Sequence, residues 1–259
     1  MKLRSLLVLL TLLPLSIAAQ TPAERGLAIA QESDRRDIGF TDSQADMVMT
    51  LKNRQGEESV RDLRVKVLEV QGDGDKSLTI FDEPRDVKGT ALLTFAHGAD
   101  PDDQWLYLPA LKRVKRIASK NKSGPFMGSE FAFEDIGSQE VEKYTYKYVR
   151  DEAVDGKQAF LIERYPVDEN SGYTRQEVWM DQAEYIPLKI VYYDRKNELL
   201  KTLVFSDYQQ YLGKHWRAGK MHMENHQTGK STLLEWKNYR FRTGVDAGDF
   251  NQNALKRAR

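Results

Sequence analysis

The side chains best suited to metal or acid–base chemistry in this 259-residue sequence are its four histidines and one adjacent pair of carboxylates. His222 and His226 have the i, i+4 spacing with which a helix presents two ligands to one metal ion. Met221 and Met223 alternate around His222 as in a strand, however, and on a strand the two imidazoles would lie about 13 Å apart. We therefore predict no metal site and no cofactor, with the histidines solvated or locally hydrogen-bonded.

Glu134 and Asp135 are neighbouring carboxylates that could serve general acid–base catalysis. Paired catalytic carboxylates usually come from separate elements that face each other. A neighbouring pair more often forms a solvated turn or an ion pair, here with Arg113 or Arg116. The sequence has no Cys, no G-x-S-x-G or H-E-x-x-H motif and no phosphate-binding glycine loop. It thus predicts no catalytic residue and a protein that is not an enzyme, with a hydrolase based on Glu134 or Asp135 as a lesser alternative.

A cationic run, Lys112–Arg116, suggests electrostatic recognition at one place on the surface. Lys and Arg together number 39, as do Asp and Glu, so the whole chain offers no net attraction for nucleic acid or an anionic membrane. The run is either the solvated face of a strand or a contact for an anionic head group or acidic partner, which Arg113 and Arg116 would bind through bidentate hydrogen bonds. We predict no nucleic-acid partner.

An apolar, glycine-containing loop follows this run. Its large side chains are Phe126, Met127, Phe131 and Phe133. Loops are ordinarily polar because they run over the wet surface. A loop with this composition must cover something apolar, which is either the core of the protein itself or a bound ligand.

The N-terminus has the pattern of a secretory signal peptide. Lys2 and Arg4 precede the apolar run Leu6–Leu13, and small residues follow it up to Ala19. The run is shorter than the roughly 20 apolar residues that span a bilayer. We predict that residues 1–19 are cleaved, and that the exported protein is soluble, without disulfides or an N-terminal lipid anchor.

A helix of roughly 17 residues is predicted next. Thr21, Pro22 and Glu24 form a helix start with a capping box, and Gly39 suits the residue beyond the helix end. Leu27, Ala30 and Ile38 would give this helix a thin apolar stripe.

Beyond Gly39 the apolar residues alternate with a period of two, which is typical of half-buried strands. Short turns separate the runs, and Asp155-Gly156 is a pair favoured by a type I′ hairpin turn. Short connections make sequential strands antiparallel neighbours. We predict a single mainly β domain over residues 20–259, a meander of about a dozen strands that twist curls toward closure.

Three runs of residues resemble the outer-membrane lipoprotein-sorting protein family, a branch of the periplasmic lipoprotein-carrier (LolA-like) superfamily. They are Val87–Leu93, Gln104–Leu111, and Arg116-Ile117 with Phe126–Phe131. The resemblance implies an incomplete, strongly curved antiparallel β-barrel with the N-terminal helix and a loop or helix lid over an apolar concavity. It also implies a carrier of lipid or lipidated protein in the periplasm of a Gram-negative bacterium, linked to a resistance-nodulation-division exporter.

The predicted function is therefore a soluble, monomeric periplasmic carrier that shuttles hydrophobic cargo between an inner-membrane exporter and an outer-membrane acceptor. An envelope sensor that uses the same fold to bind lipid and a membrane partner is the alternative. Methionine suits a cavity that repacks around varied tails, although these methionines could equally fill the core. The candidate cavity and lid residues are Met47, Met49, Leu63, Val65, Trp105, Tyr107, Phe126, Met127, Phe131, Phe133, Met221 and Met223.

Overall fold

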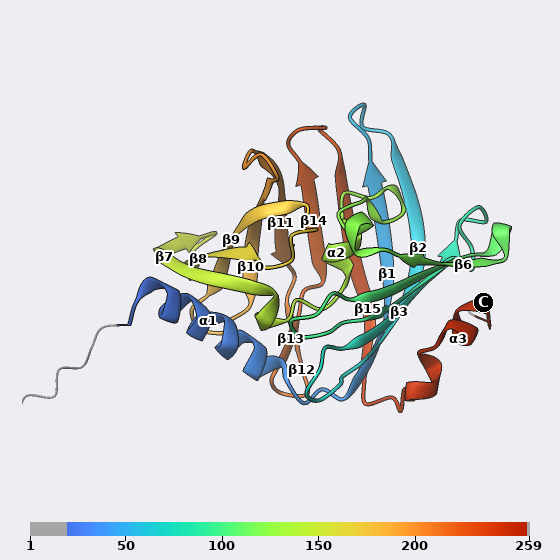
Figure 1. Ribbon diagram of the computed structural model, residues 1–259, viewed down its shortest axis with the longest axis horizontal. Helices are drawn as coiled ribbons and strands as arrows, with labels where there is room; N and C mark the ends of the chain where they lie inside the picture. The colour runs from blue at the N-terminus through green and yellow to red at the C-terminus, as the bar shows by residue number, and fades with distance from the viewer. Residues whose placement is uncertain (1–19, 258–259) are drawn as a thin grey trace, which may run out of the picture.

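The alternating residues form one large antiparallel sheet in the computed structural model, which describes residues 20–257 (Figure 1). The predicted signal peptide lies outside these residues. The strands are β1 (Asp42–Lys52), β2 (Glu58–Leu68), β3 (Lys76–Glu83), β4 (Ala91–Phe95), β5 (Asp103–Leu108), β6 (Arg113–Ile117), β7 (Tyr144–Val154), β8 (Lys157–Pro166), β9 (Tyr173–Asp181), β10 (Pro187–Asp194), β11 (Leu199–Ser206), β12 (Gln209–Tyr211), β13 (His215–Arg217), β14 (Lys220–Asn225) and β15 (Ser231–Phe241).

Thirteen of these strands pair in the order β6-β5-β4-β3-β2-β1-β15-β14-β11-β10-β9-β8-β7, and β12 pairs only with β13. The prediction of a mainly β fold with antiparallel neighbours is confirmed. The sheet is open, because its edge strands β6 and β7 are not hydrogen-bonded to each other in the described part of the chain. It is therefore not a closed barrel.

Hairpin turns stand where the sequence predicts them. Asp155 and Gly156 join β7 to β8 with φ angles of 49° and 79°, the two left-handed conformations that a type I′ turn requires. Asn197, with a φ of 60°, lies in the turn between β10 and β11. These turns keep successive strands adjacent and account for most of the sheet order.

Helix α1 (Pro22–Asp37) has the predicted capping box between Thr21 and Glu24. Its apolar stripe is not the predicted one, because Leu27 and Ile38 are 39% and 50% exposed. Of the predicted residues only Ala30 is buried, and Gly26 and Ile29 complete the buried face. A Cβ on Gly26 would stand only 2.8 Å from the backbone nitrogen of Tyr148, so the helix lies directly against the backbone of β7.

The other helical segments are short. They are η1 (Pro109–Leu111), η2 (Ser119–Asn121), η3 (Phe126–Gly128), α2 (Phe133–Ile136), η4 (Val141–Lys143), η5 (Ala247–Asp249) and α3 (Gln252–Arg257). Helix α3 covers the outer face of β4, where Leu255 is fully buried beside Leu93 and Phe250. The larger core lies on the other face, between the sheet, α1 and the segment that contains α2.

Candidate functional site

Residues 118–143, which we call the crossover, join β6 to β7. Because those strands are the two edges of the sheet, the crossover must traverse its whole inner face. In Figure 1 the part that carries α2 lies in front of the central strands β14, β15 and β1. The crossover is thus placed to cover the concavity, as the predicted lid would be.

The first half of the crossover fills the inner face beside β1–β3. Phe126 and Phe131 are buried, and the Phe126 ring lies 5.8 Å from that of Phe81 on β3. Arg61 on β2 donates a hydrogen bond to the carbonyl oxygen of Met127 at 2.6 Å. Of the two interpretations of this apolar loop, the structure supports the first, since these side chains cover the protein's own core.

A buried ion pair fastens α2 to the sheet. Lys201 on β11 and Asp135 on α2 lie 2.7 Å apart, with side chains only 4% and 6% exposed. The Tyr173 hydroxyl also donates to Asp135 at 2.9 Å, and Lys201 donates to the carbonyl oxygen of Glu130 at 2.9 Å. A buried charge is stable only when it is paired and hydrogen-bonded in this way.

Glu134 has a different set of partners. It accepts hydrogen bonds at 2.8 Å from the Ser171 hydroxyl and from the backbone nitrogen of Gly172. Burial, followed by the neighbouring Asp135 carboxylate, raises the pKa of Glu134. The expected ion pair of this carboxylate pair with Arg113 or Arg116 is wrong, because both carboxylates turn inward, to β11 and to the start of β9.

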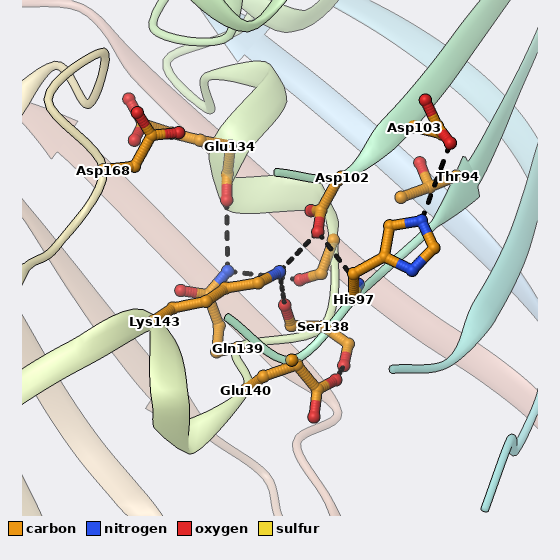
Figure 2. Close-up of polar contacts among 12 residues, drawn as sticks. Thr94, His97, Asp102, Asp103, Glu134, Ser138, Gln139, Glu140, Lys143 and Asp168 are labelled. Atoms are coloured by element: carbon orange, nitrogen blue, oxygen red, sulfur yellow. Dashed lines mark hydrogen bonds and ion pairs between the residues drawn. The ribbon is translucent and has the colours of Figure 1, made fainter. Parts of the chain in front are cut away.

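Polar contacts tie the crossover to the segments on either side of it (Figure 2). Lys143 donates to Asp102, just before β5, at 2.5 Å, and also to the carbonyl oxygen of Ser138 at 3.3 Å. Lys122 pairs with Asp168 at 2.6 Å, beyond the end of β8. These contacts hold the two edges of the sheet together through the crossover, although the strands themselves do not pair.

The second half of the inner face is hollow. A cavity of about 930 Å³ lies between α1, the end of the crossover and strands β8 to β11 and β14. Its apolar wall consists of Ile162, Val178, Met180, Ile190, Leu203, Phe205 and Met221. Arg164, Tyr146 and Tyr192 contribute polar groups from the strands, and burial raises the pKa of both tyrosines. Carboxylates from α1, the crossover and the β2–β3 connection line the cavity as well.

A smaller cavity of about 240 Å³ adjoins the larger one, since Phe205 and Met221 line both. Aromatic residues dominate its wall, and the buried Nε1 of Trp236 has no hydrogen-bond partner there. The two spaces thus share part of their apolar lining.

The predicted cavity residues fall into three groups. Met221 lines the large cavity. Trp105 and Tyr107 pack on the opposite face of the sheet, in the cluster around Leu93 and Phe250. The others lie in or against the core of the inner face, outside the cavity wall: Met47, Met49, Leu63, Val65, Phe126, Met127, Phe131, Phe133 and Met223. The sequence therefore placed ten of the twelve candidates on the inner face of the sheet, but only Met221 in the cavity wall.

Arg113 and Arg116 are exposed on the edge strand β6 and are not in the cavity wall. Arg116 forms an ion pair with Asp103 on β5. Their predicted contact with a head group or partner stays a prediction, and it would take place outside the cavity.

The histidines are dispersed. His226 shares a 2.7 Å hydrogen bond with Thr202, and His97 shares one of 2.8 Å with Asp73. His215 differs from the expectation, because its ring is buried without a hydrogen-bond partner against Phe40 and Phe241, and burial lowers its pKa. Within residues 20–257 no cluster of three potential ligands is placed to hold a metal ion.

Known proteins share both this sequence and this fold. A family model described as that of an uncharacterized protein matches residues 73–257. The outer-membrane lipoprotein-sorting protein domain from Vibrio parahaemolyticus is 61% identical, with a TM-score of 0.89 over 90% of this chain and 99% of that one. The chain belongs to the outer-membrane lipoprotein-sorting protein family.

Two further structures extend the lipoprotein-sorting family comparison. A DUF1329 family protein from Desulfovibrio piger is 32% identical with a TM-score of 0.87, over 91% of this chain and all of that one. A LolA superfamily protein from Nitrosomonas europaea is 20% identical with a TM-score of 0.71, over 91% of this chain and all of that one, and shows the common LolA-like fold. No curated protein sequence matches the chain.

This member of the lipoprotein-sorting family contains no helix, among its described residues, that is long and apolar enough to cross a membrane. Apart from Met221, the strand residues that line its cavity were predicted from the sequence only as parts of strands. Their alternation predicted which side chains share a face, but no local signal marks where the crossover stops filling that face.

Proposed function

We propose that the protein is a soluble periplasmic carrier that holds the hydrocarbon part of a lipid or lipidated protein in the large cavity. The observation that carries this proposal is the apolar wall of a 930 Å³ space in a member of the lipoprotein-sorting family. Small-molecule sites in proteins typically measure about 300–1,000 Å³ and are lined mainly by apolar side chains.

The energetics of a carrier suit such a wall. Each methylene gains about 0.8 kcal/mol on leaving water, so a tail of about 14 methylenes gains of order 11 kcal/mol. The free energy of binding in a carrier must be close to this gain, so that the tail leaves the membrane but can still be released. Met180 and Met221 in the wall provide flexible side chains that repack around different tails.

A pair of neighbouring substitutions on β11 tests the proposal. Leu203 faces the cavity, whereas the adjacent Val204 is 36% exposed on the other face. Leu203→Trp should occupy the space and reduce transfer of a fluorescent phospholipid between vesicles by about tenfold. Val204→Trp adds the same ring outside the cavity and should leave transfer unchanged. Equal transfer by both variants, or none by the wild type, would contradict a lipid-carrying cavity.

We further propose that cargo arrives from an inner-membrane exporter of the resistance-nodulation-division class and leaves to an outer-membrane acceptor. Cross-linking in cells distinguishes this route from the sensor alternative. A carrier should give two transient partners, one in each membrane. One stoichiometric membrane partner, retained regardless of cargo, would instead indicate an envelope sensor.

A further inference from the structure

Acidic side chains outnumber basic ones in the lining of the large cavity. Eight carboxylates and a single guanidinium line it, although the whole chain has equal numbers of acidic and basic residues. The acidic residues are Asp34, Asp37, Glu69, Asp73, Asp75, Asp135, Glu140 and Glu142, and the basic one is Arg164.

Half of these carboxylates have partners of their own. Asp37 pairs with Arg217 at 2.6 Å and Asp135 with Lys201 at 2.7 Å. Asp73 contacts His97, and Glu69 accepts hydrogen bonds from the backbone nitrogens of Gly39 and Thr41 at 2.6 and 2.7 Å. The charges of these four carboxylates therefore already have partners within the protein.

The other four have no ion pair within residues 20–257. Asp34 and Glu142 have no side-chain hydrogen bond there either, while Asp75 accepts one from Val70 and Glu140 one from Ser138. They come from three segments, namely α1, the β2–β3 connection and the end of the crossover. We call these four residues the acidic rim.

The rim carboxylates are close enough to disfavour one another's ionisation. Burial, then the Glu142 and Asp37 carboxylates, raise the pKa of Asp34. Burial also raises the pKa of Glu140, partly offset by the Ser138 hydroxyl and the Lys143 ammonium. The Asp34 and Glu142 carboxylates raise the pKa of Glu140 further. A cation among these groups would stabilise their charged forms and relieve the repulsion.

Among residues 20–257, Arg164 is the one cation in the wall of the large cavity, while Lys143, near two rim residues in the chain, is paired with Asp102. The Arg164 guanidinium donates to Gln176 at 2.6 Å and lies 4.3 Å from the centre of the Tyr144 ring. Arg164 stands on β8 within the sheet, whereas the rim stands on α1, the crossover and the β2–β3 connection. The wall therefore combines an apolar interior with an acidic border.

We propose that the cavity takes an amphiphile whose polar end is positively charged, such as a primary or quaternary ammonium, with the acidic rim around that charge. This inference rests on the proposed lipid-carrying function and specifies the class of its ligand. A concave site lined by one sign of charge concentrates ligands of the opposite sign. The predicted head-group contact of Arg113 and Arg116 would select the opposite charge and lies elsewhere, on β6.

Three probes with the same tail separate the charge preference from tail binding. Tetradecyltrimethylammonium, tetradecyl maltoside and tetradecyl sulfate are each titrated by calorimetry below their micelle concentrations. At low salt the cationic probe should bind about tenfold more tightly than the sulfate, with the neutral probe between them, and added salt should shrink the difference. Binding of the sulfate as tightly as the cationic probe would overturn the inference.

A double substitution ties the preference to the rim. Asp34→Asn with Glu142→Gln removes two charges that hold no other part of the chain, and should abolish the cationic preference while leaving the neutral probe bound. Glu169→Gln with Glu224→Gln removes two exposed charges outside the cavity, neither of which has a hydrogen-bond or ion-pair partner in the described chain, and should keep the preference. A preference that survives the rim variant would also overturn the inference.

The neutral probe distinguishes the two possible failures. If none of the three probes binds, the proposed lipid-carrying function fails, and the inference fails with it. If the maltoside binds but the ammonium has no advantage, only the charge inference fails. If the sulfate binds most tightly and Arg164→Gln removes that binding, the cavity recognises an anionic head group, and the inference is wrong.

Discussion

Lys201 and Asp135 show how a few charged side chains determine the arrangement of the inner face. Each is almost fully buried, and together they hold α2 against β11 and β9 through one ion pair and the Tyr173 hydroxyl. No sequence pattern marks the pair, because the two residues lie far apart in the chain and each alone resembles a surface charge. Only the packing of the crossover brings them together.

Removing one partner of this pair should be costly. Lys201→Met leaves the Asp135 charge buried without its cation, and we expect the free energy of unfolding to fall by about 3–5 kcal/mol in urea titrations. Adding Asp135→Asn should recover most of that loss, because the uncompensated charge disappears. Lys88→Met, which breaks an exposed pair with Glu83, should cost about 1 kcal/mol or less. Similar losses for Lys201→Met and Lys88→Met would contradict the role of the buried pair.

Asp75 in the acidic rim should make stability depend on pH. Burial, with the nearby Glu140 and Glu69 carboxylates, raises its pKa to about 7. The folded chain then binds this proton more tightly than the unfolded chain, whose pKa is about 3.9. Ionising Asp75 therefore lowers the free energy of unfolding as the pH rises from about 4 to about 7, and the loss is complete above that range.

Asp75→Asn should remove this effect while keeping the oxygen that accepts from Val70. The melting temperature of the variant should rise relative to the wild type as the pH increases from about 4 to about 7, and the difference should then stay constant. A difference that does not vary over this range would mean that Asp75 does not titrate there.

At the scale of elements, the strands and turns could be predicted from the sequence, and the filling of the inner face could not. Alternation and Asp155-Gly156 were sufficient to locate the hairpins. Alternation fails at Leu188, which should share a face of the sheet with Ile190. The pairing of β10 with β9 is irregular beside Pro187, so Leu188 lies on the outer face while Ile190 faces the cavity. Met47 and Met49 do not line the cavity for a different reason, because the crossover covers the half of the inner face on which they lie.

The crossover is a core element as well as a cover, which gives Phe126 a measurable role. Phe126→Ala should lower the free energy of unfolding by about 3–5 kcal/mol, because it opens a space among Phe81, Phe131 and Phe133. Leu111→Ala, at a side chain that is 67% exposed, should change it by less than about 0.5 kcal/mol. Both are measured by chemical denaturation. A small loss at Phe126 together with impaired lipid transfer would identify the loop as a movable lid.

At the scale of the whole molecule, an open sheet of thirteen strands is made into a container by one crossing segment. The first half of that segment supplies the core that a sheet without a second layer lacks. Its second half, with α1, leaves a space above β8 to β11 whose wall is apolar and whose border is acidic. If the cavity binds cargo as we propose, stability and binding depend on different halves of one surface, and each should change separately on mutation.

The proposed occupant of the cavity is an amphiphile with an acyl tail, and native mass spectrometry of protein released gently from the periplasm tests for it most directly. We expect the wild-type protein, and Val204→Trp, to carry an additional mass that dissociates on denaturation and is an amphiphile with an acyl tail. Leu203→Trp should lose most of it. Wild-type protein found only at the mass of the chain, and unable to take up labelled lipid afterwards, would contradict the carrier function.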